Sequence, residues 1–220
     1  MPNADCPICG DIDASEWSGI ATMYGQDALT RALLYRTADV CCYAAPGALM
    51  PLYLIFSPIQ HLSRSLDLMI EDAQRFFRAL MDFLNKIELT LPNRFWAFEH
   101  GGRNATTGGP GCVDHAHIHL IPDDSLFVPV LSDIQMELGV QGEKREFPWS
   151  FQTPENYLTL MSPERTWVLF DASSCESQYV RRLMSRRLRC PNQWNWQIYT
   201  HEANFMQTLV AIDRLKPLVA

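Results

Sequence analysis

Hydrophobic and polar positions follow two different periods in the first part of the chain. Between Met69 and Ile87, apolar residues recur three and four positions apart, with charged residues between them. Because an α-helix turns once in about 3.6 residues, this spacing predicts a long amphipathic helix, and Ser65 is its expected N-cap. Residues 1–30 show no period and are expected to be irregular. Short apolar runs that end at turn residues predict four strands, over residues 39–45, 52–57, 94–99 and 115–121.

The remainder of the chain carries a further set of elements. Its apolar runs and turn residues predict two strands followed by two helices, over residues 157–161, 166–170, about 176–189 and about 202–215. The chain is therefore expected to have an α+β fold in two parts. The first is a domain over residues 1–125, and the second is a C-terminal β-β-α-α extension over residues 126–220 that packs on it.

Composition narrows the class of protein. The 220 residues are 47% hydrophobic and 20% charged, which supports a folded core and argues against global disorder. The net charge of −7 argues against a general nucleic-acid coat. No stretch is apolar enough to cross a bilayer, and the N-terminus lacks the pattern of a secretory signal. Seven cysteines in such a chain favour reduced thiols in a cytoplasmic protein, some of them binding metal, over a disulfide framework.

Three histidines follow one another at every second position of the last strand predicted in the first domain. Side chains alternate across a strand, so His115, His117 and His119 are expected to share one face. Buried imidazoles need hydrogen-bond partners, which makes this row costly as pure structure. It suits metal ligation, nucleophilic attack or proton transfer. A surface strand that is merely rich in histidine is the alternative, and the neighbouring glycine-rich loop argues against it.

Two cysteines near the N-terminus have the spacing of a metal-binding pair. Cys6 and Cys9 are separated by two residues, and two thiolates at that spacing can bind one Zn²⁺, which prefers four nitrogen or sulfur ligands. The chain has a single motif of this kind, so the other ligands would be histidines or distant cysteines. The alternative is a pair of ordinary thiols.

Four motifs together resemble a known family. They are CPIC at residues 6–9, FSPIQH at 56–61, FEHG at 98–101 and GCVDHAHIH at 111–119. Their order resembles that of the histidine-triad (HIT) superfamily over about residues 1–125. The second and third motifs are especially similar to galactose-1-phosphate uridylyltransferases, a divergent branch. The resemblance implies a HIT-like α+β fold, with an antiparallel sheet and a long helix.

The resemblance also implies a structural zinc. In the zinc-bearing relatives the metal is held at positions that correspond to Cys6, Cys9, His61 and His115. Four protein ligands leave no open coordination position, so such a zinc would be structural.

The family's reaction centres on the middle histidine. By resemblance, His117 is the nucleophile that attacks the α-phosphate of a nucleotide or dinucleotide and forms a nucleotidyl-histidine intermediate. His119 would donate to a phosphate oxygen or help to protonate the leaving group. The uridylyltransferases have glutamine at this third position, so His119 favours a hydrolase that releases a nucleoside monophosphate. Two alternatives stay open: a nucleotidyltransferase or phosphorylase, and a non-catalytic adaptor that binds a nucleotide or RNA.

Other residues are candidates for binding the substrate. The loop before the histidines contains Gly109, Gly111 and Cys112, whose backbone N–H groups could hold phosphate oxygens. His100 and Asn104 are weaker candidates. For the nucleoside, the early strands offer apolar side chains for which packing in the core is the preferred interpretation: Cys41, Tyr43, Leu54 and Phe56. Homodimers are usual in the resembling family, which makes a second copy a candidate partner.

The segment 178–189 is rich in arginine, and Arg182, Arg186 and Arg189 would share one helical face. A solvated basic face is the favoured interpretation. The alternative is that one or two arginines reach a phosphate of a long substrate or of RNA. Residues 176–197 also resemble, over a short match, the end of CwfJ-type HIT-like proteins. Trp194 and Trp196, in that stretch, could stack on bases but are expected in the core or an interface.

Overall fold

The structure of the chain is a computed structural model. It describes residues 6–15, 17–102, 115–123, 126–138 and 154–219, together with the backbone of residues 143–145. Among these described residues, no helix is both long and apolar enough to span a membrane.

Eight strands in the described residues form one sheet, in the order β1-β2-β3-β5-β4-β7-β8-β6. Every neighbouring pair is antiparallel. The strands are β1 (Leu33–Arg36), β2 (Val40–Ala44), β3 (Leu54–Pro58), β4 (Phe95–Gly102), β5 (Ile118–Pro122), β6 (Glu143–Arg145), β7 (Asn156–Met161) and β8 (Trp167–Asp171).

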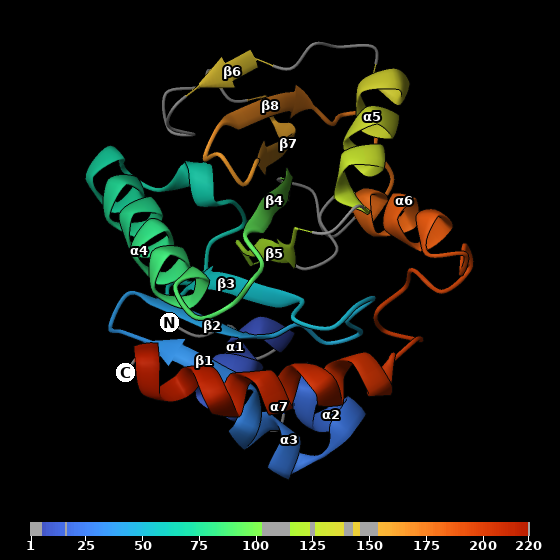
Figure 1. The fold of residues 1–220 in the computed structure, drawn as a ribbon. Helices are drawn as coiled ribbons and strands as arrows, with labels where there is room; N and C mark the ends of the chain where they lie inside the picture. The colour runs from blue at the N-terminus through green and yellow to red at the C-terminus, as the bar shows by residue number, and fades with distance from the viewer. Residues whose placement is uncertain are drawn as a thin grey trace.

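Helices pack at both ends of this sheet (Figure 1). They are α1 (Pro7–Asp13), α2 (Gly19–Tyr24), α3 (Gln26–Ala32), the short 3-10 helix η1 (Ser65–Asp67), α4 (Ile70–Glu88), α5 (Phe127–Glu137), α6 (Tyr179–Arg187) and α7 (Glu202–Val219). Helix α7 runs beside α3 and under β1 and β2, whereas α5 packs against α6 at the other end. The expected α+β fold, with an antiparallel sheet and a long helix, is confirmed.

The long helix begins later than its pattern predicts. Its buried face is the expected apolar one, formed by Ala73, Phe76, Phe77, Leu80, Phe83, Leu84 and Ile87. The N-cap is Met69 rather than Ser65, which begins η1 instead. The backbone N–H and the hydroxyl of Ser65 both donate to the buried carboxylate of Glu99. Ser65 therefore binds Glu99 of β4 and does not serve as the N-cap that the local spacing predicts.

Residues 6–15 and 17–30 are not irregular, contrary to the expectation from their sequence. They form α1, α2 and α3, and β1 follows at once. Each helix has only six or seven residues, too few for an apolar period to show. Side chains cap two of them: the Cys6 sulfur accepts from Cys9 N–H in α1, and the Ser18 hydroxyl accepts from Ala21 N–H in α2. Helix α5 and the short β6 were not predicted either.

The C-terminal extension continues the same sheet. Its strands and helices β7, β8, α6 and α7 follow the expected β-β-α-α order, and β7 pairs with β4 along six residues, from Ala97 to Gly102. The ring of Tyr157 stands where a side chain at Gly101 would lie, with ring atoms 2.4–2.7 Å from the Cβ position. Glycine is therefore required for this close approach of the two strands.

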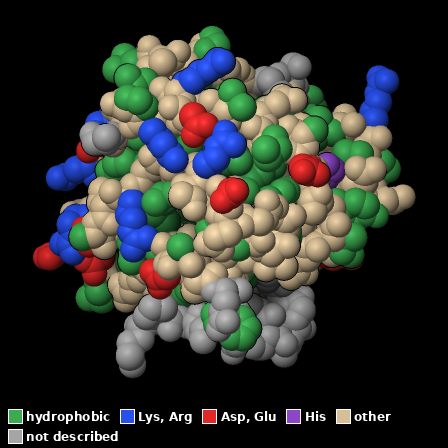
Figure 2. Space-filling view, turned by 90° about the horizontal axis from the view of Figure 1, so that it is seen from below, with side chains coloured by type: hydrophobic (Ala, Val, Ile, Leu, Met, Phe, Trp, Pro, Cys, Tyr) green, Lys and Arg blue, Asp and Glu red, His purple; other side chains and the backbone are tan. Residues whose placement is uncertain are grey.

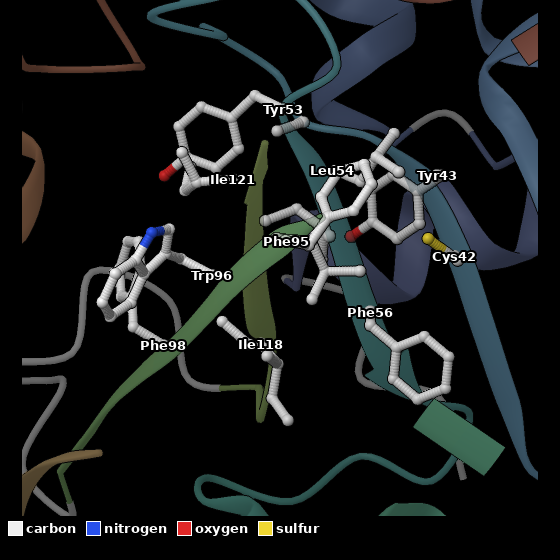
Figure 3. Close-up of a cluster of buried hydrophobic side chains, with 14 of the residues drawn as sticks. Cys42, Tyr43, Tyr53, Leu54, Phe56, Phe95, Trp96, Phe98, Ile118 and Ile121 are labelled. Carbon is white, nitrogen blue, oxygen red and sulfur yellow. The ribbon is translucent and has the colours of Figure 1, made fainter. Parts of the chain in front are cut away.

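The core includes β4 and β5, the strands that carry His100 and His119. Figure 3 shows buried side chains of β2, β3, β4 and β5 in this core, among them Tyr43, Leu54, Phe56, Phe98 and Ile118. The face seen from below in Figure 2 mixes side chains of both charges with apolar ones, rather than presenting a field of one sign. On α3 and α7, for example, Arg31 pairs with Asp213 at 2.7 Å.

Candidate functional site

Four cysteine and histidine side chains converge between α1, the end of β3 and the start of β5. Cys6 and Cys9 stand at the first turn of α1, His61 follows β3, and His115 precedes β5. The Nδ1 atom of His115 lies 3.5 Å from the Cys6 sulfur and 3.4 Å from the Cys9 sulfur. The Nδ1 atom of His61 lies 3.4 Å from the Cys9 sulfur. All four donor atoms lie within 4.8 Å of one another.

These distances fit one tetrahedral metal ion. Bonds of about 2.3 Å to sulfur and about 2.1 Å to nitrogen at tetrahedral angles would separate sulfur from nitrogen by about 3.5 Å. The orientation of His115 agrees with this, because its Nε2–H donates to the carbonyl oxygen of Pro58 at 3.0 Å. The Nδ1 lone pair is thereby left facing the two sulfurs. The four residues implied by the motifs could therefore hold a zinc ion, with two sulfur and two nitrogen donors.

His117 is held in one orientation by its own backbone neighbourhood. Its Nδ1–H donates to the carbonyl oxygen of His115 at 2.7 Å, so the neutral ring carries its lone pair on Nε2. The side chain is buried, and burial lowers the pKa of His117 below its ordinary value. A neutral imidazole with an unprotonated nitrogen is the form that can act as a nucleophile.

His119 lies next to His117, with ring centroids 4.7 Å apart. Its ring stacks on Phe98 at 4.4 Å, and a hydrogen bond of 2.9 Å joins its Nδ1 to the hydroxyl group of Tyr53. Burial lowers the pKa of His119 well below its ordinary value, and the neighbouring charges of His117 and Arg181 act in the same direction. The ring is therefore neutral and fixed on two sides.

The expected strand over residues 115–121 begins later in the structure. Strand β5 starts at Ile118, so His115 and His117 both precede it. Ala116 is held from two directions: its N–H donates to Leu62 O at 2.6 Å, and its carbonyl oxygen accepts from the Ser57 hydroxyl at 2.9 Å. His115 joins the cysteine cluster, whereas His117 and His119 line pockets beside it. The prediction that all three histidines share one face of a strand is wrong for this reason.

Two pockets meet at His117, His119 and Arg181. The first, which we call the α1 pocket, is mainly apolar and has a cavity volume of about 40 Å³. Its other lining residues are Pro7, Ile8, Asp11, Tyr43, Ala45, Pro46, Ile55 and Trp196. Of the apolar candidates for a nucleoside site, Tyr43 alone lines it. Cys41, Leu54 and Phe56 belong to the buried core.

The second pocket lies on the side of β4 and α6, and we call it the α6 pocket. Its cavity volume is about 20 Å³, and beyond the three shared residues it is lined by Phe98, His100, Gln178, Tyr179 and Val180. Both ring nitrogens of His100 are buried, and neither has a hydrogen-bond partner among the described residues. Burial, followed by the nearby His117, lowers the pKa of His100 to about 4. His100 therefore presents a neutral ring whose donor and acceptor have no partner in the part of the chain that the structure describes.

The other predicted substrate-binding residues cannot be placed. Asn104, Gly109, Gly111 and Cys112 lie outside the described residues.

Glu99 links the segment after His61 to the sheet. Its fully buried carboxylate accepts from Ser65 N–H at 2.8 Å and from the Tyr157 hydroxyl at 2.7 Å. Burial raises the pKa of Glu99, and these donors oppose the rise. The contacts tie η1, β4 and β7 together next to His100. A glutamate inside an otherwise apolar strand was the available signal for such a buried polar contact.

Arg181 is the site residue that the sequence did not single out. It is 3% exposed, and its Nε and Nη2 atoms donate to Trp194 O at 2.9 Å and to Gly47 O at 2.7 Å. Its guanidinium also lies over the ring of Tyr53, 5.6 Å from the centroid. Arg182 and Arg186, on the predicted basic face, instead pair with carboxylates of neighbouring segments. The arginine-rich pattern predicted a helix with a basic face, but it could not show that Arg181 is the buried arginine of that helix.

Comparisons with known proteins give similarity of structure alone. No family model matches the chain, and no curated protein matches its sequence. A HIT family hydrolase from Clostridium thermocellum is 16% identical, with a TM-score of 0.39 over 56% of this chain and 95% of that chain. A histidine triad nucleotide-binding protein from Candida albicans is 15% identical, with a TM-score of 0.39 over 61% of this chain and 97% of that chain. Similarities this weak support no conclusion about activity.

Proposed function

We propose that the chain is a HIT-type nucleotide hydrolase that releases a nucleoside monophosphate through a nucleotidyl-histidine intermediate on His117. The observation that carries this proposal is the hydrogen bond from His117 Nδ1–H to His115 O, at 2.7 Å. It leaves Nε2 unprotonated in a ring that lines two pockets. An imidazole fixed in this tautomer is prepared for attack on phosphorus.

The proposed reaction proceeds in two steps. The Nε2 lone pair of His117 attacks the α-phosphorus, and the bond to the leaving group breaks with its electron pair remaining on that group. Water then attacks the same phosphorus, the P–N bond breaks back to Nε2, and the proton of water leaves with solvent or a phosphate oxygen. His119, whose ring is fixed by Tyr53 and Phe98, is placed to donate a hydrogen bond to the phosphoryl group.

We assign the nucleoside half of the substrate to the α1 pocket because of its lining. That pocket is mainly apolar and has the aromatic side chains of Tyr43 and Trp196 in its wall, which suits a planar base. Asp11, on the same wall, offers a carboxylate for hydroxyl groups of a sugar. We propose this assignment for the nucleoside and leave the identity of the base to experiment.

We further propose that Cys6, Cys9, His61 and His115 hold a structural zinc ion. Bound there, zinc would have four protein ligands and would join α1 to the segments around β3 and β5 without taking part in the reaction. The chain itself contributes orientation. The contact of His115 Nε2 with Pro58 O fixes the ring of His115, and the backbone carbonyl oxygen of the same residue accepts from His117.

A turnover panel with a paired histidine control tests the function. The substrates are dinucleoside polyphosphates, nucleotide sugars, nucleoside phosphoramidates and capped or adenylated RNA. His117→Ala is expected to lower the release of nucleoside monophosphate by about 10⁴-fold, as for loss of a nucleophile. His201→Asn, which changes a histidine outside both pockets at a left-handed position that asparagine tolerates, is expected to leave the rate unchanged.

Two kinds of turnover result would contradict the hydrolase. Release that requires an added phosphate or sugar phosphate would indicate a nucleotidyltransferase or phosphorylase. Equal rates for wild type and His117→Ala, or no turnover of any substrate, would favour the binding adaptor. A radiolabelled nucleotide that stays on wild type after denaturation in base, but not in acid, would directly reveal the phosphorus–nitrogen bond.

A further inference from the structure

Arg181 carries a buried positive charge without a counter-charge in the part of the chain that is described. The side chain is 3% exposed, and no carboxylate among the described residues forms an ion pair with it. Two backbone carbonyl oxygens, of Gly47 and Trp194, accept from two of its nitrogens. These contacts satisfy donors but supply only partial charges. A buried cation is costly unless it is paired, so this arrangement favours the arrival of an anion.

The anion would arrive at a defined place. Arg181 lines both pockets, together with His117 and His119, so it stands at the boundary where a phosphate under attack would lie. The α1 pocket is mainly apolar. The α6 pocket, in contrast, adds His100, with both ring nitrogens unpartnered among the described residues, and the buried amide of Gln178. Of the two pockets, the α6 pocket therefore has the more polar lining.

We propose that the α6 pocket is an anion subsite in which Arg181 binds the phosphate of the leaving group, so that the preferred substrate is a phosphoanhydride. This inference rests on the proposed function for the identity of the α-phosphate and the attacking group. The bond that breaks is the P–O bond of the anhydride, and its electron pair stays on the departing phosphate. A guanidinium beside that oxygen stabilises the charge as it develops.

The preorganisation of Arg181 supports this role. Its Nε and Nη2 atoms are fixed by carbonyl oxygens from two separate segments, at Gly47 and Trp194, which limits the rotation of the guanidinium. Gln178, one turn earlier, is also fixed, because its amide oxygen accepts from Trp196 N–H at 3.2 Å. Residues 178–181 supply four of the residues that line the α6 pocket. The extension would thus complete the site rather than only pack on it.

A neutral leaving group would gain little from such a pocket. Ammonia or an alcohol, released from a phosphoramidate or a simple ester, offers no negative charge to a buried guanidinium. A departing phosphate does, and the neutral ring of His100 could donate one further hydrogen bond to it. The neighbouring arginines are unsuited, because Arg182 and Arg186 are already engaged by Glu176 and Glu137 at 3.2 and 3.4 Å.

Equilibrium binding tests the subsite without any turnover. In the His117→Ala background, affinities for nucleoside monophosphates and diphosphates of the four common bases are measured by calorimetry. Adding Arg181→Gln is expected to weaken diphosphate binding by about 30-fold or more, the cost of truncating one partner of a buried charged pair. Monophosphate binding is expected to stay nearly unchanged. Arg186→Gln, on the same helix and exposed, is the matched control and should change neither affinity.

The outcomes separate cleanly. Equal losses for both nucleotides, or an unchanged diphosphate affinity, would overturn the leaving-group subsite. Arg181→Lys covers the case in which the glutamine variant does not fold: it keeps the charge but loses the forked geometry, and about a tenfold loss confined to the diphosphate is expected. An unchanged affinity there would also contradict the proposal. Because no arm uses the chemistry of His117, failure of the turnover panel and failure of this subsite remain distinguishable.

Discussion

Five of the six histidines of this chain form two groups that differ in what their ring nitrogens face. His61 and His115 turn toward two sulfur atoms at 3.4–3.5 Å, and the second nitrogen of His115 is held by a backbone carbonyl. His117 and His119 instead line open pockets, and His100 beside them has no partner among the described residues for either nitrogen. The first group faces the cysteine sulfurs, whereas the second group lines the two pockets.

Ala116 separates His115, in the first group, from His117, in the second. Ala116 donates to Leu62 O and accepts from the Ser57 hydroxyl, so its backbone is clamped next to His61 on one side and to β3 on the other. His115 and His117 therefore face different surroundings although they are two positions apart. The same clamp joins the groups mechanically, because displacing the segment after His61 would move the backbone that orients His117.

The largest expected effect comes from opening the cysteine group. Cys9→Ser should lower the bound zinc from about one ion per chain to near zero and destabilise the protein by more than about 4 kcal/mol. Turnover should fall as well, since Ala116 and His117 lose their fixed neighbour. Metal analysis of protein purified without chelator, together with chemical denaturation, measures both quantities.

Two controls sharpen this first test. Cys175→Ser changes a partly buried cysteine outside the cluster and should retain both metal and stability. His117→Ala should retain both while losing activity. A Cys9→Ser protein with full zinc content and wild-type stability would show that the cluster is an ordinary group of buried side chains.

The second test concerns the free-energy cost of burying His100, a member of the group of histidines that line the pockets. The pKa of His100 falls from its ordinary value of 6.5 to about 4 on folding, so the unfolded chain binds more protons between these pH values. Its contribution to stability is complete above pH 6.5 and is lost as the pH falls toward 4. The loss is at most about 3.5 kcal/mol, because each unit of pKa shift corresponds to about 1.4 kcal/mol.

Substituting the ring isolates that contribution. Chemical denaturation of wild type and His100→Gln between pH 7 and pH 4 should show a shallower loss of stability in the variant, since glutamine does not titrate. His201→Asn, outside both pockets, should follow the wild-type curve. Parallel curves for wild type and His100→Gln would mean that His100 is accessible to protons in the folded protein, and the contrast between the groups would weaken.

The sequence correctly predicted which four residues converge at the cysteine cluster. It was less successful in predicting the backbone conformation that brings residues together. The alternation and spacing of apolar residues were enough for the sheet and for α4, and the motifs identified the four residues that converge at the cysteine cluster. The start of β5 was missed because alternation in HAHIHLI continues through residues whose backbone is held by Leu62 and Ser57 instead of by a strand partner. Such tertiary hydrogen bonds leave no periodic trace.

Arg181 illustrates a second limit. Within a run of arginines every member has the same local pattern, and the helical face that counts as buried depends on what packs against it. Here the partners are Gly47, from the turn after β2, and Trp194, from the segment after α6. Both partners lie too far from Arg181 in the sequence for residue spacing to reveal the contact. Only the fold therefore distinguishes Arg181 from Arg182.

The prediction with the smallest expected effect concerns the orientation of His119. The Tyr53 hydroxyl is 2.9 Å from His119 Nδ1, and phenylalanine would keep the ring while removing this contact. Tyr53→Phe should lower kcat by about tenfold and stability by about 1 kcal/mol, the usual range for one hydrogen bond to a buried group. The decisive measurement is a double-mutant cycle with His119→Ala, in which Tyr53→Phe should cause no further loss of kcat. If the two losses simply add, Tyr53 does not act through His119. The ring would then be held by its stacking on Phe98 alone, and the two groups of histidines would differ in their surroundings but not in how firmly each ring is fixed.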